Sequence, residues 1–155
     1  MSFRIRGLDP APFAPLFGQS DSQLAARNIH RSRVDSSPGV PDRITMTDLE
    51  VGDSVLLLNH THQPHASPYR AAHAIYIKEG AQDAYDRTDH IPEVLQQRTL
   101  SLRGFDTDGM IADAALVDGA DCADAIETLL ADPQVAYIHA HFAARGCYAG
   151  LITRA

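Results

Sequence analysis

The segment that decides the fold runs from Val135 to Thr153 and reads VAYIHAHFAARGCYAGLIT. Two stretches rich in apolar and aromatic residues, 135–142 and 147–153, flank the four residues AARG at 143–146. Short apolar runs that are joined by a connection containing glycine are typical of a β-hairpin. We therefore expect the chain to end in two antiparallel strands.

The side chains of this hairpin alternate between the two faces of the sheet, so His139 and His141 share a face. One register pairs Phe142 with Cys147. In that register Tyr148 lies opposite His141 and joins the histidines, while Cys147 points to the other face. A slip of one residue brings Cys147 beside the histidines and permits a Cys–His nucleophile; without it, Cys147 is an inert thiol. Both registers are compatible with the sequence.

Outward from the hairpin, hydrophobic periodicity and turn residues divide the chain into short elements. Strands are predicted over residues 29–34, 43–46, 53–60, 71–78, 98–106 and 110–117. Helical segments are predicted over residues 9–18, 20–28, partly 80–97, and 121–132, with a loop over 61–69. Ser20 and Gln23 fit a capping box at the start of the second helical segment. In the segment over 121–132, an apolar stripe is predicted because Cys122, Ile126 and Leu129 fall at i, i+4 and i+7. The turn residues at 106–109, DTDG, predict a hairpin between the last two of these strands.

These elements indicate an α+β fold, because strands follow one another through hairpins and the helices come in blocks. We expect a single domain over residues 1–155, with a mainly antiparallel β-sheet, short N-terminal helices and one helix before the last hairpin. A chain of 155 residues buries enough surface for one core without disulfides or a structural metal. Its two cysteines do not form a disulfide framework.

The charge balance limits the partners of the chain. It has 13 Lys and Arg against 20 Asp and Glu, a formal net charge of −7. This argues against a nucleic-acid or membrane partner. The apolar runs are too short for a membrane helix, and the first residues, MSFR, do not resemble a signal peptide, so we expect a cytoplasmic protein. The oligomeric state stays open.

Histidine is the compositional anomaly of the chain. Six of the eight histidines fall into two groups, at positions 60, 62, 65 and 73 and at positions 139 and 141. Two His-x-His pairs on neighbouring strands can supply three or four nitrogens to Zn or Fe. This alternative metal site consists of His60, His62, His139 and His141. No acidic ligand accompanies the pairs, and the competing interpretation is that they are ordinary polar residues.

The leading functional interpretation is a binding protein or enzyme for a small anionic molecule, with no cofactor. Arg70 is the predicted anion clamp and Tyr69 a donor, because a guanidinium holds a carboxylate or phosphate bidentately. The other predicted ligand-binding residues are Ser67, Arg103 and Tyr148, and the predicted acid–base groups are His62, His139 and His141. Alternatively, both arginines pair with surface carboxylates, and the domain is a non-catalytic interaction module.

Three stretches of the chain carry a resemblance to a known family. They are residues 1–8 (MSFRIRGL), residues 56–71 with LNHTHQP and SPYRA, and residues 137–149 with YIHAH and GCYA. Together they resemble an uncharacterised bacterial family, the domain of unknown function numbered twelve hundred and three. The resemblance covers nearly the whole chain and implies a single-domain family, with no activity attached. His60 and Gly150 depart from the family pattern, which weighs against a metal role for His60.

Overall fold

The computed structural model describes residues 2–155; Met1, at the start of the first stretch that carries the family resemblance, lies outside the described residues. The strands are β1 (Phe3–Arg6), β2 (His30–Arg33), β3 (Ser54–Gln63), β4 (Ala71–Lys78), β5 (Asp86–Thr88), β6 (Thr99–Phe105), β7 (Ile111–Asp118), β8 (Tyr137–Phe142) and β9 (Tyr148–Arg154). The α-helices are α1 (Asp21–Ala25), α2 (Glu93–Gln96) and α3 (Cys122–Ala131), and two 3-10 turns are η1 (Ala14–Leu16) and η2 (Gly119–Asp121).

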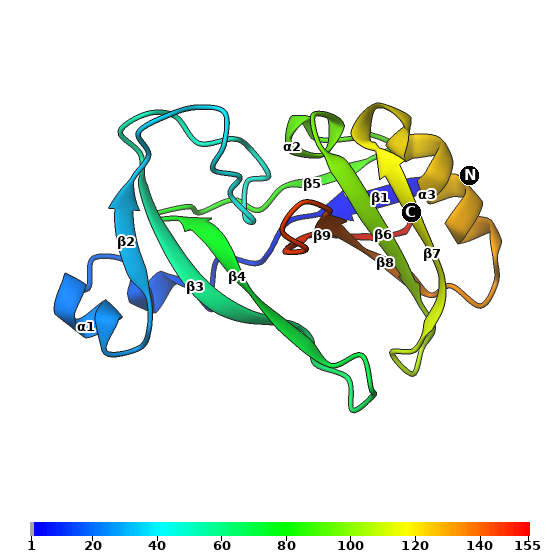
Figure 1. Ribbon diagram of the computed structural model, residues 1–155, viewed down its shortest axis with the longest axis horizontal. Helices are drawn as coiled ribbons and strands as arrows, with labels where there is room; N and C mark the ends of the chain where they lie inside the picture. Colours follow the sequence, from blue (N-terminus) through cyan, green and yellow to red (C-terminus); the bar gives the residue numbers. More distant parts are fainter. Residues whose placement is uncertain (1) are drawn as a thin grey trace.

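Two antiparallel sheets make up the framework. The larger has six strands in the order β5-β1-β9-β8-β6-β7, and the smaller has three in the order β2-β3-β4. The sheets lie side by side along the long axis of the molecule, with α1 at one end and α3 at the other (Figure 1). The α+β fold with mainly antiparallel sheets is thus confirmed. None of the described helices is long and apolar enough to cross a membrane.

The final hairpin adopts the first of the two registers left open by the sequence. His141 lies opposite Tyr148, and the Phe142 N–H donates to the Cys147 carbonyl over 2.9 Å. A β-bulge between Ala140 and His141 shifts the register, so that His139 lies opposite Leu151. Cys147 is therefore on the face opposite the histidines, and the Cys–His pair predicted for the slipped register is absent from the described hairpin.

Strand β3 is longer than the sequence predicts. The predicted loop over 61–69 is wrong at residues 61–63, because Thr61 and Gln63 still pair with Ala72 and Ala71 of β4. The register shifts between Thr61 and Gln63, which leaves His62 as the extra residue of a bulge. As a result His62 and Gln63 are both buried, although they are neighbours in the sequence.

Four other elements differ between the prediction and the structure. The strand predicted over residues 43–46 is wrong: the Asp42 carboxylate accepts the Thr45 N–H over 2.7 Å and bends the chain into a turn. Strand β1 was missed although Phe3 and Ile5 alternate with arginines, and β5 was missed because its three residues are exposed and polar. The first N-terminal helical segment narrows to the single turn η1.

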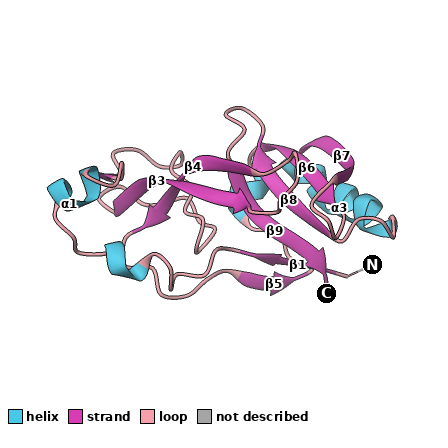
Figure 2. Ribbon diagram, turned by 90° about the horizontal axis from the view of Figure 1, so that it is seen from below, coloured by secondary structure: helices cyan, strands magenta, loops and turns pink. Residues whose placement is uncertain are grey.

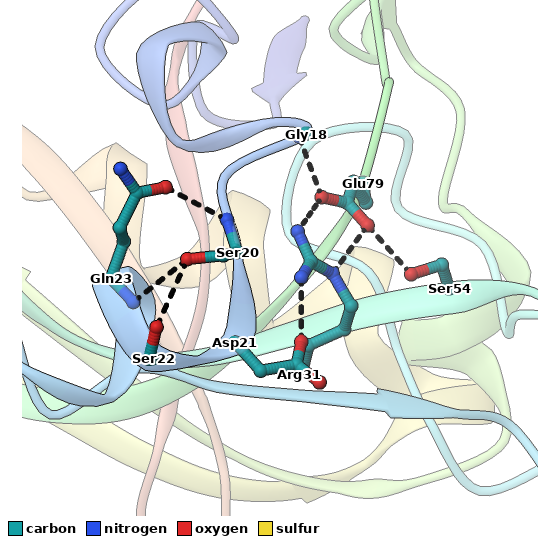
Figure 3. Close-up of polar contacts among 8 residues, drawn as sticks. All are labelled: Gly18, Ser20, Asp21, Ser22, Gln23, Arg31, Ser54 and Glu79. Atoms are coloured by element: carbon teal, nitrogen blue, oxygen red, sulfur yellow. Dashed lines mark hydrogen bonds and ion pairs between the residues drawn. The ribbon is translucent and has the colours of Figure 1, made fainter.

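The second N-terminal helix is confirmed, together with its capping box. The Ser20 hydroxyl accepts the Gln23 N–H, and the Gln23 side chain accepts the Ser20 N–H (Figure 3). Close by, the Arg31 guanidinium bridges Asp21 of α1 and Glu79, at 2.7 Å and 2.6 Å (Figure 3). Hydrogen bonding from Arg31 lowers the pKa of Glu79 to about 2. This network ties α1 to the three-stranded sheet.

The main core lies between α3 and the six-stranded sheet, and Figure 2 shows α3 at the same end of the molecule as β6, β7 and β8. The predicted apolar stripe of Cys122, Ile126 and Leu129 is fully buried there. A periodicity of i, i+4 and i+7 places the three side chains on one helix face. From β8 this core receives Ile138 and Ala140, so the histidines that alternate with them point to the opposite side of the sheet.

One buried guanidinium joins the segment before β3 to the final hairpin. Arg43 Nε donates to the Tyr148 carbonyl over 2.8 Å, and Nη1 donates to the Pro41 carbonyl over 2.7 Å. Its Nη2 lies 3.1 Å from Cys147 Sγ. Arg43 is only 2% exposed, and burial lowers its pKa. Each of its three nitrogens has a partner, which is what a buried charge requires.

We predict that Arg43→Met lowers the free energy of unfolding by about 3 kcal/mol, because the carbonyls of Tyr148 and Pro41 lose their donors. Arg43→Lys should recover less than half of that loss, since one ammonium cannot reach both carbonyls. Urea unfolding measures both values. The control is Arg33→Met, an exposed arginine with one bond to the Gly52 carbonyl, expected to change stability by about 0.5 kcal/mol or less. Equal losses in Arg43→Met and the control would contradict this role.

Candidate functional site

Three histidines from two sheets meet between those sheets. His62 comes from the bulge near the end of β3, and His139 and His141 come from the inner face of β8. One ring nitrogen of each lies within 4.8 Å of those of the other two. We call these three residues the histidine triad. Of the four metal ligands predicted from the sequence, the structure brings these three together.

The histidine triad is buried and short of hydrogen-bond partners. The exposed fractions of His62, His139 and His141 are 9%, 5% and 1%. Both ring nitrogens of His62, Nδ1 of His139 and Nε2 of His141 are buried without a partner among the described residues. An unpaired buried polar atom costs about 1–3 kcal/mol. Four such atoms in one place indicate a site for a bound group that takes up imidazole lone pairs or accepts imidazole N–H groups.

His141 is held in one orientation by the connection of the final hairpin. Its Nδ1 lies 2.8 Å from the Gly146 carbonyl oxygen. A carbonyl only accepts, so Nδ1 carries the proton and Nε2 carries the lone pair. The buried Nε2 of His141 is thus in the form that a metal ion binds, and the carbonyl plays the orienting role usual for metal-bound histidines.

Aromatic rings fix the other two imidazoles. The Tyr148 ring stacks on His62 with centroids 5.2 Å apart and an interplanar angle of 4°. The rings of Phe105 and Tyr137 lie 5.0 Å and 5.2 Å from that of His139. Rings packed in this way have few accessible rotamers, so the triad is preorganised. Tyr148, predicted as a ligand-binding residue, is part of this wall, and burial raises its pKa.

Burial keeps the triad neutral. Desolvation, followed by repulsion from neighbouring histidines and Arg103, lowers the pKa of His62 to about 4 and that of His139 to about 3. Desolvation, with Arg103 and His62 adding to it, lowers the pKa of His141 to about 4. All three imidazoles are therefore uncharged at neutral pH, which is the state that coordinates a metal.

Arg103 is the cation nearest to the triad in the sheet register. It lies on β6 directly opposite His139, and its Nε is 3.4 Å from the Ser101 hydroxyl. No ion pair of Arg103 occurs within residues 2–155, so the alternative in which it pairs with a surface carboxylate is not realised there. Burial lowers its pKa, yet a guanidinium stays charged at neutral pH.

Three other predicted ligand-binding residues lie at the tip of the β3–β4 connection. The Ser67 hydroxyl donates to the Gly109 carbonyl over 2.9 Å, and Arg70 Nη1 donates to the Pro64 carbonyl over 2.6 Å. Tyr69 packs edge-on against Phe105. Within the described chain, none of the three hydrogen-bonds or stacks with the triad. The anion clamp at Arg70 stays a prediction.

Two further histidines border the triad. His60 lies on the same strand as His62, but its ring contacts Phe13 at 5.9 Å and it is not one of the three histidines whose nitrogens converge. His73 lies opposite His60 on β4, with its ring 6.5 Å from that of His62. Sequence reasoning did not propose His73 for the site. The signal was present, because pairing the two predicted strands places His73 opposite His60.

A pocket connects the triad to the surface. Its volume is about 410 Å³, and both His62 and His139 line it. The other lining residues are Gln63, Pro64, His65, Ala136, Tyr137, Leu151 and Thr153. His141 lies behind these two histidines, outside the pocket lining. A group held by the triad is therefore reached from the pocket through His62 and His139.

Comparison with known proteins gives a family and no relative. A family model described as "Protein of unknown function (DUF1203)" matches residues 39–154. This range contains the triad, Arg103 and the final hairpin. No curated protein and no solved structure matches the chain significantly. The chemistry of the site has to be inferred from its own residues.

The lowered pKa values predict acid sensitivity in the protein treated with a chelator. In the unfolded state each histidine takes up a proton near pH 6.5, whereas in the folded state the triad resists protonation until about pH 3 to 4. The unfolded state binds more protons in this window, so stability falls as pH falls. We expect a loss of about 2 kcal/mol or more between pH 6.5 and pH 5 in urea unfolding.

The matched variants are His139→Leu, which removes one buried imidazole of the triad, and His30→Ala, which removes an exposed side chain outside it. The first should flatten the pH dependence of the unfolding free energy, and the second should leave it as in the wild type. The same slope in all three proteins would show that the triad does not cause the acid sensitivity.

Proposed function

The chain belongs to the DUF1203 family, whose function is unknown, and we propose that it binds a transition-metal ion, Zn²⁺, through His62, His139 and His141. The observation that carries the proposal is the convergence of buried imidazole nitrogens that have no partner among the described residues. A metal ion satisfies several such lone pairs at once, which no single hydrogen-bond donor does.

The spacing supports a metal ion of this size. A point equidistant from three atoms that are 4.8 Å apart lies about 2.8 Å from each, and zinc–nitrogen bonds are about 2.0–2.1 Å long. Each ring thus has to move by less than about 1 Å to reach bonding distance. Small torsional shifts within the same side-chain rotamers supply movements of that size without a change in the backbone.

The donor set favours zinc over iron. Non-haem iron sites typically combine two histidines with one carboxylate, whereas three histidines are a typical set for catalytic zinc. No Asp or Glu belongs to the converging group among residues 2–155. Neither cysteine belongs to this group either, and Cys147, just before β9, lies beside Arg43 on the opposite face of the hairpin.

Three protein ligands leave a coordination position of tetrahedral zinc free for a small molecule. The pocket lined by His62 and His139 supports placing this free position on the pocket side. Sites of this kind bind and polarise a ligand or a water molecule, whereas purely structural zinc sites have four protein ligands. The proposal therefore includes an accessible metal rather than a buried structural one.

Direct capture of an anion by the histidines has weaker support than metal binding. With pKa values of about 3 to 4, the triad carries no positive charge at neutral pH and does not attract an anion by itself. Arg70, the clamp predicted from the sequence, bonds to its own loop. A bound Zn²⁺ supplies the charge that these neutral rings lack.

Isothermal titration of chelator-treated protein with Zn²⁺ tests the proposal. We expect one ion per chain in the wild type. In His62→Ala, His139→Ala and His141→Ala we expect the Zn²⁺ affinity to fall by at least about 100-fold, because each variant loses one of three ligands. His60→Ala, on the same strand as His62, is the control and should stay within about threefold of the wild type. Circular dichroism verifies that each variant is folded.

Two results contradict the proposal. Absence of stoichiometric binding to folded wild-type protein would remove the metal site altogether. Affinities that are the same in the triad variants and the wild type would move the site elsewhere. A loss in His60→Ala equal to that in the triad variants would instead restore the four-histidine site predicted from the sequence.

A further inference from the structure

We propose that the ligand on the pocket side of the metal is a small anion, a carboxylate or another oxyanion, and that Arg103 is the residue that selects for its charge. This inference rests on the proposed function, because it concerns the free position of the same metal. It assigns a ligand class to the pocket and a role to an arginine that has no ionic partner among residues 2–155.

The charge of the site requires an anion. Neutral imidazoles leave Zn²⁺ with two positive charges, and Arg103 adds a third beside His139. Carboxylates usually balance such charges when a metal site is buried. Here the converging group contains histidines alone. Uncompensated charge is costly away from water, so an incoming anion gains from both cations at once.

The immediate neighbours of Arg103 do not compensate its charge. In the six-stranded sheet it lies between Ala114 of β7 and His139 of β8. Along its own strand the next side chain on the same face is Ser101, whose hydroxyl accepts from Arg103 at 3.4 Å. The acidic residue of β7 closest in register, Asp113, is paired with Gly104, one position along, and so belongs to the opposite face.

Two carboxylates that are largely buried elsewhere in the fold are already engaged. Asp48 is paired with Arg98 at 2.6 Å, and the Asp42 carboxylate accepts from Thr45 and from the Lys78 N–H. Neither is therefore free to turn toward the triad. The positive charge of the site is a fixed property of the fold, in a chain whose formal net charge is −7.

The pocket limits the size and form of the anion. About 410 Å³ suits a small molecule. Leu151 and Pro64 offer apolar contacts, and Thr153 and Gln63 offer polar ones. One Gln63 amide hydrogen already bonds to the Tyr137 hydroxyl at 2.9 Å, which orients the amide. A ligand with a charged head at the metal and a short, partly apolar body fits this lining.

Arg103 does not line the pocket, so it acts through its charge across His139 rather than as a contact residue. It is a positioning residue in this proposal. The distinction has a measurable consequence: a lysine at position 103 keeps the charge and should keep most of the anion affinity, whereas a neutral isostere should not.

The test uses full-length protein loaded with Co²⁺ in place of Zn²⁺, because the visible bands of Co²⁺ report its ligands. Acetate and inorganic phosphate are the anionic probes, and acetamide is the neutral control. In the wild type we expect both anions to change the bands in a saturable way and acetamide to leave them unchanged. Arg103→Gln should bind Co²⁺ at least as tightly as the wild type, and its acetate affinity should fall by at least about tenfold.

Arg103→Lys should stay within about threefold of the wild type for acetate. Arg33→Gln removes the same charge from an exposed site and should match the wild type for metal and anion. Arg70→Gln tests the clamp predicted from the sequence: a loss of acetate binding there with none in Arg103→Gln would overturn our assignment. Equal acetate affinity in Arg103→Gln and the wild type would overturn it too.

The two proposals fail in different ways. If folded wild-type protein takes up neither Zn²⁺ nor Co²⁺, the proposed function fails and the anion proposal with it. If Co²⁺ binds with loss in the triad variants but neither anion changes its bands, the metal site stands and the anion proposal is wrong.

Discussion

Strand β8 is buried on both faces, and the rest of the structure depends on this constraint. One face sends Ile138 and Ala140 into the core under α3, and the alternate face sends His139 and His141 against the three-stranded sheet. A strand normally resolves such alternation by turning its polar face to water. Here the second sheet covers that face, so the histidines are forced out of solvent. The packing of the two sheets thus produces a cluster of buried, uncharged imidazoles.

Covering the polar face costs free energy that the described residues recover only in part. Arg43 joins the segment before β3 to the carbonyl of Tyr148, and the Tyr148 ring in turn stacks on His62. Gly146 satisfies one nitrogen of His141. Four of the other ring nitrogens are buried without a partner in the described part of the chain, and local violations of this kind are characteristic of functional sites. Stability and the proposed metal binding therefore compete for the same residues.

Local patterns in the sequence predicted much of the framework. The capping box at Ser20, the apolar stripe through Ile126 and the β6–β7 hairpin all follow from residues within a few positions of one another, and all are confirmed. The failures have equally local causes. A hydrogen bond to the Asp42 side chain makes a turn where a strand was predicted at 43–46. Pairing with β4 extends β3 through a bulge, which the hydrophobic periodicity of the sequence does not predict.

By itself the sequence determined which side chains share a strand face, because alternation with period two is a covalent property of an extended chain. It therefore placed His139 with His141. Only the tertiary structure decided the register that turns Cys147 away toward Arg43, brought His62 to the pair from a strand about 75 residues earlier, and put Arg103 rather than Arg70 beside them. The physical reason is that these choices depend on how two sheets pack, which is set by the summed burial of many distant side chains and not by any one segment.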